Sequence, residues 1–497
     1  MYNILIGGEA GQGIETTASV LEKLLKASGY FVYSTRDFMS RVRGGHNFTL
    51  IRFGTEIISS HSDVLNGIIA MNDETIELHK NKLSDEGFIL CDSSLSTNDS
   101  KAIKLDMNAM AKEIGNPRVS GSIAVGAIAK LFSLDSSNIA SAIKTSVKPQ
   151  YFDINVKAAT LGYDKVDSWF PHVKGNFANW MTISGSSSLA LGAIAAGVNF
   201  YSAYPMSPST AVMEYLASKS VATGTLVEQA EDEIAAINMA IGASFAGARA
   251  MTGTSGGGFC LKVEALGLSG IAEIPLVVVN VQRPGPATGL PTRTEQSDLK
   301  FVISASQGEF PRMVIAVRTH EDAFYQTIRA FHLAEKYQIP VIILSDQYLG
   351  DSTSTVKPFD LSNIEVAEHA NASDIPGEYL RYRLTEDGIS PRLIPGKSKH
   401  FVTADSDEHD EYGRITESSE VRIQMMDKRM KKLEKLKEEL IEPELFGSDN
   451  PETLFLAWGS THGPILEAVK TLNKKEEGKY GALVFGDVFP LPKKLLI

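Results

Sequence analysis

The chain has 497 residues, a length that at about 150 residues per domain predicts three domains, each with its own core. Hydrophobic residues make up 43% and charged residues 22%, which are ordinary proportions for a globular protein, so a disordered or fibrous chain is excluded. Sixty acidic residues against 48 basic ones give a formal charge of −12, which argues against nucleic acid as a partner.

The first predicted domain, residues 1–175, begins with a buried strand and a glycine turn, YNILIGGEAGQG, that leads into an apolar-periodic helix. Further strands are expected at 48–53, 67–71 and 87–91, and a helix of small residues at 122–132. Strands alternating with helices indicate an α/β layer fold. Because the N-terminus lacks a basic segment and no apolar run approaches about 20 residues, we expect no signal peptide, no membrane span and a cytoplasmic location.

The glycine turn of this domain is open to two interpretations. Its glycines do not follow GxGxxG spacing, so a nicotinamide nucleotide site has little support. Gly11 and Gly13 precede a helix whose free N–H groups can hold an anion, and Arg41, Arg43 and His46 of RVRGGHN would add charge for a phosphate-bearing ligand. A plain strand–helix turn explains the same residues, and the sequence leaves both interpretations open.

The second predicted domain, residues 176–360, repeats the alternation of helix and strand. A helix is expected at 230–246, followed by the strand PLVVVNV, a helix at 321–334 and the strand PVIIL. A polar connector, 361–450, then ends in an amphipathic helix. We expect the basic KRMKK run on this helix to be a solvated face, because nearby glutamates form i,i+4 pairs with it; an acidic partner is the alternative.

The last predicted domain, residues 451–497, begins a third α/β unit. It contains the strand LFLAWG, a helix and the strand ALVFG, and then the sequence ends. So few elements predict an incomplete domain.

One motif that carries chemistry is the segment YSAYPMSPST. Pro205 and Pro208 fix the backbone on both sides of Ser207, and a rigid loop that presents a hydroxyl suits ligand contact. Helix capping by Ser209 or Thr210 is the alternative role, and both roles can hold together.

Three further segments are candidates for the same site. Glu233 opens an alanine-rich helix, although an acidic cluster also simply favours a helix N-terminus. Thr254 and Ser255 lie in MTGTSGGG, a loop that either lines a cofactor or merely turns. Arg283 and Arg293 follow a strand, at the edge where α/β sheets bind ligands, and arginine grips carboxylates through two hydrogen bonds; a surface salt bridge is the alternative.

The sequence resembles the α subunits of 2-oxoacid:ferredoxin oxidoreductases in four motifs that occur in the same order: YPMSPST, the alanine-rich helix that begins with an acid, TSGGG and GPATGLPTR. It also resembles the family's γ domain in GQG and RVRGGHN. LTEDGISPRLIPG and AWGSTHGPILEAV resemble its connector and its transketolase-like C-terminal domain. The resemblance implies a multidomain α/β fold with a γ-type Rossmann-like domain, a thiamine-diphosphate pyrimidine-binding domain and a transketolase C-terminal-like domain. Met206 and Ser207 stand where the family has isoleucine and threonine.

The resemblance also implies an activity, the thiamine-diphosphate-dependent oxidative decarboxylation of a 2-oxoacid to acyl-CoA and CO2, with electrons passed to ferredoxin. Glu233 would be the catalytic acid at the pyrimidine ring nitrogen, and Ser207 and Arg293 would bind the 2-oxoacid. Coenzyme A or another anion would bind at Gly11, Gly13 and Arg43. The residues assigned to the cofactor site are Tyr204, Pro205, Ser207, Glu233, Thr254 and Ser255.

Two parts of such an enzyme are missing from the sequence. The family binds magnesium diphosphate through GDG and a later asparagine, but Gly486-Asp487 is followed by valine. Cys91 and Cys260 are too few for a [4Fe–4S] cluster held by four thiolates, and we expect both to be buried, reduced thiols. No metal site is therefore predicted here, and Mg²⁺ and the cluster would belong to a β subunit in a heterodimer.

Three alternatives stay open at this point. The chain could be an indolepyruvate-type member of the same superfamily or a non-catalytic assembly or CoA-binding subunit, although Glu233, Ser207 and Arg293 argue against loss of function. A nucleotide-dependent dehydrogenase built on the glycine turn is the third. The sequence does not choose among 2-oxoglutarate, pyruvate and branched 2-oxoacids.

Overall fold

A computed structural model describes residues 1–39, 44–368 and 375–495. The chain forms two compact units, which we treat separately. Within the described ranges, no helix is both long and apolar enough to cross a membrane, and no three His, Cys, Asp or Glu side chains form a metal-binding group.

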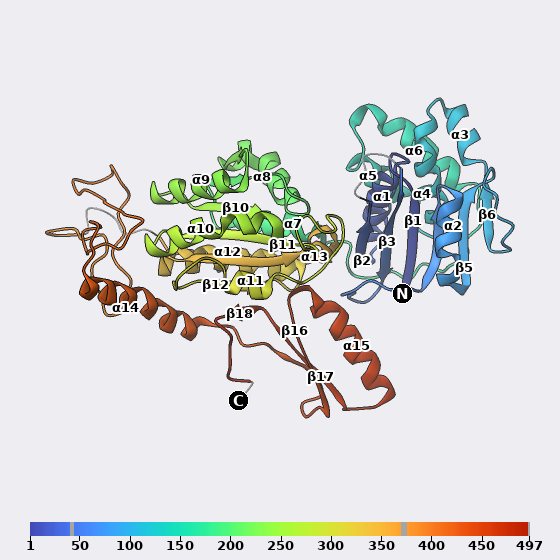
Figure 1. Ribbon diagram of the computed structural model, residues 1–497. Coiled ribbons are helices and arrows are strands. Elements are labelled where there is room, and N and C mark those ends of the chain that lie inside the picture. The colour runs from blue at the N-terminus through green and yellow to red at the C-terminus, as the bar shows by residue number, and fades with distance from the viewer. Residues whose placement is uncertain (40–43, 369–374, 496–497) are drawn as a thin grey trace. The chain divides into compact units, whose positions relative to one another are not determined.

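Unit 1, which comprises Met1–Ile183 and Asp351–Pro358, is built on an eight-stranded sheet (Figure 1). Its strand order is β6-β5-β4-β1-β3-β2-β14-β7. The strands are β1 (Tyr2–Glu9), β2 (Phe31–Asp37), β3 (His46–Gly54), β4 (Leu65–Ala70), β5 (Leu83–Asp92), β6 (Ala102–Leu105), β7 (Met181–Ser184) and β14 (Thr353–Val356). β1, β4, β5 and β6 run parallel, and β3 runs antiparallel to both β1 and β2.

The helices of unit 1 cover the two faces of this sheet unequally. They are α1 (Ile14–Ala27), α2 (Asp73–His79), α3 (Met107–Ile114), α4 (Ser120–Leu131), α5 (Ser137–Lys144) and α6 (Phe152–Tyr163), with short 3₁₀ turns at Lys80–Lys82, Pro117–Val119 and Pro149–Tyr151. α1 and α3–α6 bury one large core against β1–β5, whereas α2 closes a smaller core on the other face. In α4 and α6, Gly126 and Gly162 allow close packing, because a Cβ at either position would overlap a backbone oxygen of the other helix.

Unit 2, which comprises Ser184–Gly350 and Phe359–Ile497, contains a seven-stranded sheet of order β18-β12-β13-β11-β10-β8-β9. Its strands are β8 (Phe200–Ala203), β9 (Leu226–Gln229), β10 (Ala250–Thr254), β11 (Leu276–Gln282), β12 (Met313–Ala316), β13 (Pro340–Asp346) and β18 (Asp487–Phe489). All run parallel except β18 on the edge. Both faces of a parallel sheet must be covered, and accordingly β11 and β13 are buried along their whole length.

Helices cover both faces of this second sheet. They are α7 (Gly185–Ala195), α8 (Thr210–Thr223), α9 (Glu233–Phe245), α10 (Gly256–Ile271), α11 (Leu299–Ile303) and α12 (His320–Tyr337), and the short α13 (Gln347–Asp351) follows β13. α7, α8 and α12 pack on one face, and α9, α10 and α11 on the other. The result is a three-layer α/β unit whose loops after β8, β9, β10 and β11 share one edge.

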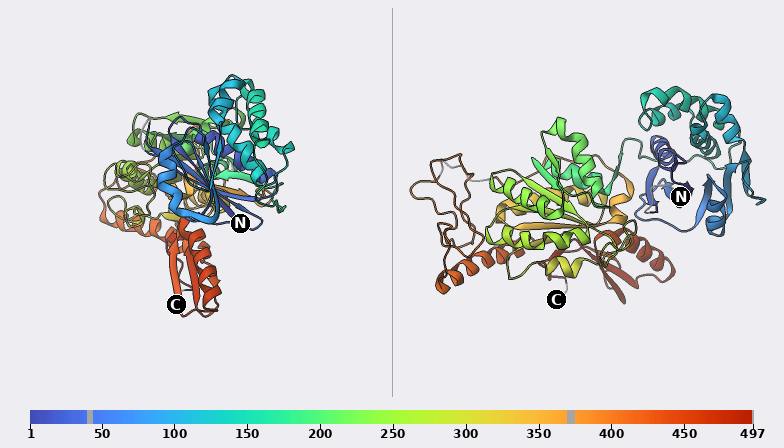
Figure 2. Two further views of the ribbon diagram at one scale, coloured as in Figure 1. Left: turned by 90° about the vertical axis from the view of Figure 1, so that its right-hand side faces the viewer. Right: turned by 45° about the horizontal axis from the view of Figure 1, so that its top comes forward.

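The remainder of unit 2 is the connector and a small three-stranded sheet. α14 (Ser419–Leu436) is followed by a 3₁₀ turn at Lys437–Glu439, and the small sheet has the order β15-β17-β16. Its elements are β15 (Leu445–Gly447), β16 (Thr453–Trp458), a 3₁₀ turn at Gly459–Thr461, α15 (His462–Lys475) and β17 (Tyr480–Phe485). α15 lies along this sheet (Figure 2).

Two sequence-based expectations are wrong. The basic run on α14 is not a solvated face, because Lys428, Arg429 and Lys432 are buried and pair with acidic residues distant in sequence. Local spacing could not reveal those partners. Cys91 is buried as expected, but Cys260 is exposed.

Candidate functional site

The candidate site lies at the carboxyl edge of the parallel sheet of unit 2. Four of its loops follow β8, β9, β10 and β11, and they hold the motifs that begin at Tyr204, Ala230, Ser255 and Arg283. Because the carboxyl ends of parallel strands share one edge, these segments converge although they are distant in sequence. This is the usual ligand-binding edge of such a sheet.

Glu233 is the first residue of α9 and its side chain is buried, with 4% of the residue exposed. Asp232 caps the helix, since its Oδ1 accepts from Ala235 N at 2.7 Å. The acidic cluster therefore does start a helix, but the capping is done by Asp232 and not by Glu233. Among the described residues, Glu233 Oε1 is buried without a hydrogen-bond partner. An unpaired buried carboxylate oxygen is costly unless a ligand satisfies it.

The TSGGG loop brings a hydroxyl and a glycine to this carboxylate. A Cβ at Gly258 would lie 2.5 Å from Glu233 Oε1 and 2.2 Å from Thr254 Oγ1, so these three residues meet at one point that only glycine leaves open. Thr254 Oγ1 also contacts Met206 Sδ at 3.9 Å, which joins the YPMSPST loop to the same place. Ser255 is fully buried at the start of α10.

The YPMSPST loop is hydrogen-bonded to Arg283, which follows β11. This arginine is buried, and its Nη1 donates to the Ser207 carbonyl oxygen at 2.7 Å. Ser207 and Tyr204 are exposed, and Pro205 is half-buried. Ser209 occupies the N-cap position of α8 but makes no side-chain capping bond, so the rigid loop does not owe its place to capping.

The loop that carries Arg293 is anchored to two neighbouring strands, β11 and β13. Asp298 accepts from Asn280 Nδ2 at 3.0 Å, and its N–H donates to Gln282 Oε1 at 3.0 Å. Gln296 Nε2 donates to Asp346 Oδ2 at 3.2 Å, at the end of β13. Arg293 itself is half-buried and donates to the Thr292 carbonyl oxygen at 3.2 Å. The two arginines of the motif thus differ, since Arg283 supports a loop and Arg293 lies on one.

Several of these supporting residues were missed by sequence reasoning. Asn280, Gln282 and Gln296 carry no recognisable spacing, and only the fold brings them to Asp298 and Asp346. Burial raises the pKa of both Asp298 and Asp346, although hydrogen bonds from neighbouring groups oppose the shift.

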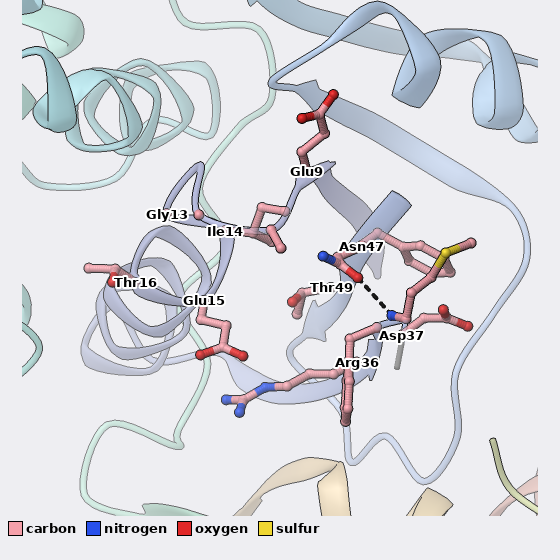
Figure 3. A pocket seen from close by; sticks show the side chains of 14 residues that line it. Glu9, Gly13, Ile14, Glu15, Thr16, Arg36, Asp37, Asn47 and Thr49 are labelled. Atoms are coloured by element: carbon pink, nitrogen blue, oxygen red, sulfur yellow. Dashed lines mark hydrogen bonds between the residues drawn. The ribbon is translucent and has the colours of Figure 1, made fainter. Parts of the chain in front are cut away.

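The glycine turn of unit 1 lines a separate cavity of about 440 Å³, shown in Figure 3. Gly11 and Gly13 both have positive φ, and Gly13 precedes the first turn of α1 without a side-chain cap. The cavity is lined by these glycines and by four charged residues, Glu9, Glu15, Arg36 and Asp37, among others. Arg41 and Arg43 lie outside the described residues.

His46 does not contribute positive charge to this cavity. It is buried, and its Nε2 lies 2.8 Å from His79 Nε2. Burial, only partly opposed by Glu74 and Asp37, lowers the pKa of His46, and burial together with His46 lowers the pKa of His79 to about 4. Two uncharged imidazoles that share one hydrogen bond are the consequence at neutral pH, so the expected charge from His46 is absent.

Two protein-family models match separate parts of the chain. Residues 3–165 match the model of the family "Pyruvate ferredoxin/flavodoxin oxidoreductase", and residues 191–428 match "Pyruvate flavodoxin/ferredoxin oxidoreductase, thiamine diP-bdg". Fold and matched models together define an α/β oxidoreductase subunit with a thiamine-diphosphate-binding domain.

Two similar proteins define the family more closely. The chain is 34% identical over 538 residues to a 2-oxoacid:ferredoxin oxidoreductase subunit alpha from Sulfolobus sp., which covers 94% of this chain and 84% of the relative. It is 33% identical over 314 residues to the 2-oxoglutarate synthase subunit KorA of Methanocaldococcus jannaschii, which covers 63% of this chain and 84% of the relative. The chain therefore belongs to the family of 2-oxoacid:ferredoxin oxidoreductase α subunits.

A solved structure agrees with this assignment. The 2-oxoglutarate:ferredoxin oxidoreductase of Magnetococcus marinus, with 2-oxoglutarate, coenzyme A and succinyl-CoA bound, has a TM-score of 0.91 and 31% sequence identity. The match covers 99% of this chain and 88% of that chain. The family and fold class predicted from the motifs are confirmed.

Proposed function

We propose that this chain holds the pyrimidine half of thiamine diphosphate in a 2-oxoacid:ferredoxin oxidoreductase and acts with a β subunit. The reaction is the oxidative decarboxylation of a 2-oxoacid to acyl-CoA and CO2, with electrons passed to ferredoxin. The single observation that carries the proposal is the buried Glu233 Oε1, which has no hydrogen-bond partner among the described residues and faces the space that Gly258 leaves open.

The residues around Glu233 suit the aminopyrimidine ring of the cofactor. When bound, thiamine diphosphate supplies the carbon nucleophile that adds to a keto carbon. The task of Glu233 is to hold a proton at Oε1 against the pyrimidine ring nitrogen, and a buried carboxyl is suited to exchange that proton. Thr254 and Gly258 shape the pocket wall beside it. Tyr204, Pro205 and Ser255 complete the proposed cofactor site.

We assign the 2-oxoacid to Ser207 and Arg293. The Ser207 hydroxyl lies on an exposed, braced loop, and the Arg293 loop is anchored through Gln296 and Asp298, so both side chains start from fixed backbone. A guanidinium grips a carboxylate through two hydrogen bonds, which suits the group that all 2-oxoacids share. The assignment covers the substrate class and applies equally to an indolepyruvate-type member, whereas the family relationship disfavours a nucleotide-dependent dehydrogenase.

Partners and further cofactors belong to the proposal as well. A β subunit would supply the Mg²⁺-diphosphate site and the [4Fe–4S] cluster, and ferredoxin would accept the electrons. Coenzyme A or another anion at Gly11, Gly13 and Arg43 stays a prediction. Three carboxylates line that cavity beside Arg36, so among the described residues the helix N-terminus and Arg36 are what would attract an anion. A cytoplasmic location also stays a prediction.

Division of the cofactor site between two chains gives the first prediction. The purified chain alone should show no 2-oxoacid-dependent reduction of ferredoxin or of a viologen dye, and the added β subunit should restore it. The assay uses equal amounts of the chain with and without β, and β alone is the control. Full activity of the chain by itself would contradict the proposed division.

Arg293→Lys gives the second prediction. A carboxylate clamp acts on substrate and transition state alike, so this change should mainly raise KM for the 2-oxoacid by about tenfold, or about 1.4 kcal/mol, with kcat little changed. Steady-state kinetics of the reconstituted complex measure it. Arg422→Lys, at a half-exposed position on α14, is the matched control. Unchanged KM in Arg293→Lys would remove this residue from the site.

A further inference from the structure

Lys262 is a fully buried lysine beside the proposed catalytic acid. It lies in the middle of α10, with 0% of the residue exposed. Its Nζ donates to the main-chain oxygen of Glu233 at 3.2 Å and to Thr252 Oγ1 at 2.9 Å. The two contacts direct the ammonium toward the first turn of α9 and the middle of β10.

The contact with Thr252 extends into a buried polar chain. Thr252 Oγ1 donates to the Ser202 carbonyl oxygen at 2.7 Å, and Ser202 Oγ donates to the Ala236 carbonyl oxygen at 2.5 Å. Lys262 and Ser202 therefore bind two carbonyls of α9, at Glu233 and Ala236, from the side of the sheet. The turn that carries the Glu233 carboxyl is fixed through these contacts.

The charge of Lys262 is costly where it lies. Burial lowers the pKa of Lys262 to about 8, although Glu233 and Asp232 oppose the shift. These two are the charged side chains that act on it, while Thr252 and Ser202 are neutral. Phe259 and Leu266, three residues before and four after it on α10, are buried as well, and a methionine at position 262 would carry no cost of desolvating a cation. Packing alone thus gives no reason for a lysine at this position.

We propose that Lys262 is a positioning residue for the thiamine reaction, whose buried ammonium fixes the first turn of α9 and places the Glu233 carboxyl against the pyrimidine ring. The inference rests on the proposed role of Glu233. Lys262 touches neither substrate nor cofactor in this scheme and acts through Glu233. A charged ammonium donates stronger hydrogen bonds than a neutral amine, so this influence should weaken as Lys262 loses its proton.

The test compares three variants in the α/β complex. Lys262→Met removes the charge and both hydrogen bonds, Lys262→Gln keeps a polar group without charge, and Thr252→Val removes one partner but keeps the ammonium. Hydrogen–deuterium exchange at C2 of bound thiamine diphosphate is followed from pH 6 to pH 10. At low pH, Lys262→Met and Lys262→Gln should slow it by roughly 10- to 100-fold, with KM for the 2-oxoacid little changed. The ratio of wild-type to variant rate should decrease above about pH 8, the pKa of Lys262.

A second readout needs no cofactor. In the chain alone, backbone amide exchange of the peptide that spans 230–240 should be faster in both Lys262 variants than in wild type, while peptides of unit 1 should not change. A wild-type ratio that stays constant across pH, or a Lys262→Gln variant that behaves as wild type, would overturn the proposal. Absence of C2 exchange in the wild-type complex tells instead against the proposed function of the chain.

Discussion

Glu233→Gln is expected to lower kcat of the reconstituted complex by roughly 10²–10⁴-fold while the chain stays folded. Glutamine keeps the size of the side chain but has no carboxyl proton to exchange with the pyrimidine ring nitrogen. The helix start is unaffected, because Asp232 provides the cap and Lys262 binds only the main-chain oxygen of residue 233. Substrate binding should change little, since Ser207 and Arg293 lie on other loops.

The direct measurement is hydrogen–deuterium exchange at C2 of bound thiamine diphosphate. Glu228→Gln and Glu231→Gln are the matched controls, because both remove an exposed carboxylate from the same acidic segment. The controls should exchange as fast as wild type, whereas Glu233→Gln should be slower in proportion to its loss of kcat. Equal slowing in a control would mean that the acidic cluster acts only through the helix N-terminus.

The sequence alone predicted those parts of the candidate site whose residues are neighbours in the chain. Pro205 and Pro208 flank Ser207, and Glu233 opens a helix of small residues, so each motif shows its own geometry. The glycines of TSGGG predicted a turn, and the fold adds the reason for Gly258, where a side chain would overlap the Glu233 carboxylate. The assigned roles of these residues stay predictions.

Residues that act across the fold could not be predicted. Lys262 has the periodicity of a core position in α10, and nothing in its surroundings in sequence reveals Glu233 or Thr252 as partners. In the same way, β14 joins the sheet of unit 1 opposite Tyr33 and Ser34, about three hundred residues before it in the chain. The predicted boundaries at residues 175, 360 and 450 remain a sequence-based division.

The basic face of α14 is the clearest such case, and it leads to the second large prediction. Lys428 Nζ lies 2.5 Å from Glu273 Oε1, and Lys432 pairs with the other oxygen. Arg381 Nη2 donates to the Glu273 carbonyl oxygen at 2.7 Å, and its Nη1 donates to Gln338 Oε1 at 3.0 Å. All of these charged side chains are buried, so one carboxylate faces two lysines and one arginine where α14 meets the end of α10. Burial lowers the pKa of Lys432 to about 7, although Glu273 opposes the shift.

Glu273→Gln should therefore lower the free energy of unfolding by about 3–5 kcal/mol, because it removes the counter-charge of the buried Lys428 and Lys432. Chemical denaturation of the chain measures the loss. Glu434→Gln is the matched control: it makes the same chemical change on α14, in a surface pair with Lys437 of the following turn, and should cost less than about 1 kcal/mol. The triple variant Glu273→Gln, Lys428→Met, Lys432→Met should regain most of the loss, since an apolar replacement removes the unpaired charges.

The same network predicts how stability depends on pH. Burial by itself would raise the pKa of Glu273. The positive charges of Lys432, Lys428 and Arg381 lower it by more than burial raises it, so the pKa in the folded chain lies well below its ordinary value of 4.5. A lowered carboxyl pKa stabilises the fold fully above pH 4.5, and this stabilisation is lost as the pH falls below that value, where the unfolded chain takes up the proton first. Below pH 4.5, the free energy of unfolding of wild type should approach that of Glu273→Gln. The difference between wild type and Glu434→Gln should stay small at every pH. A difference between wild type and Glu273→Gln that does not shrink in acid would show that the carboxylate charge does not hold α14 in place.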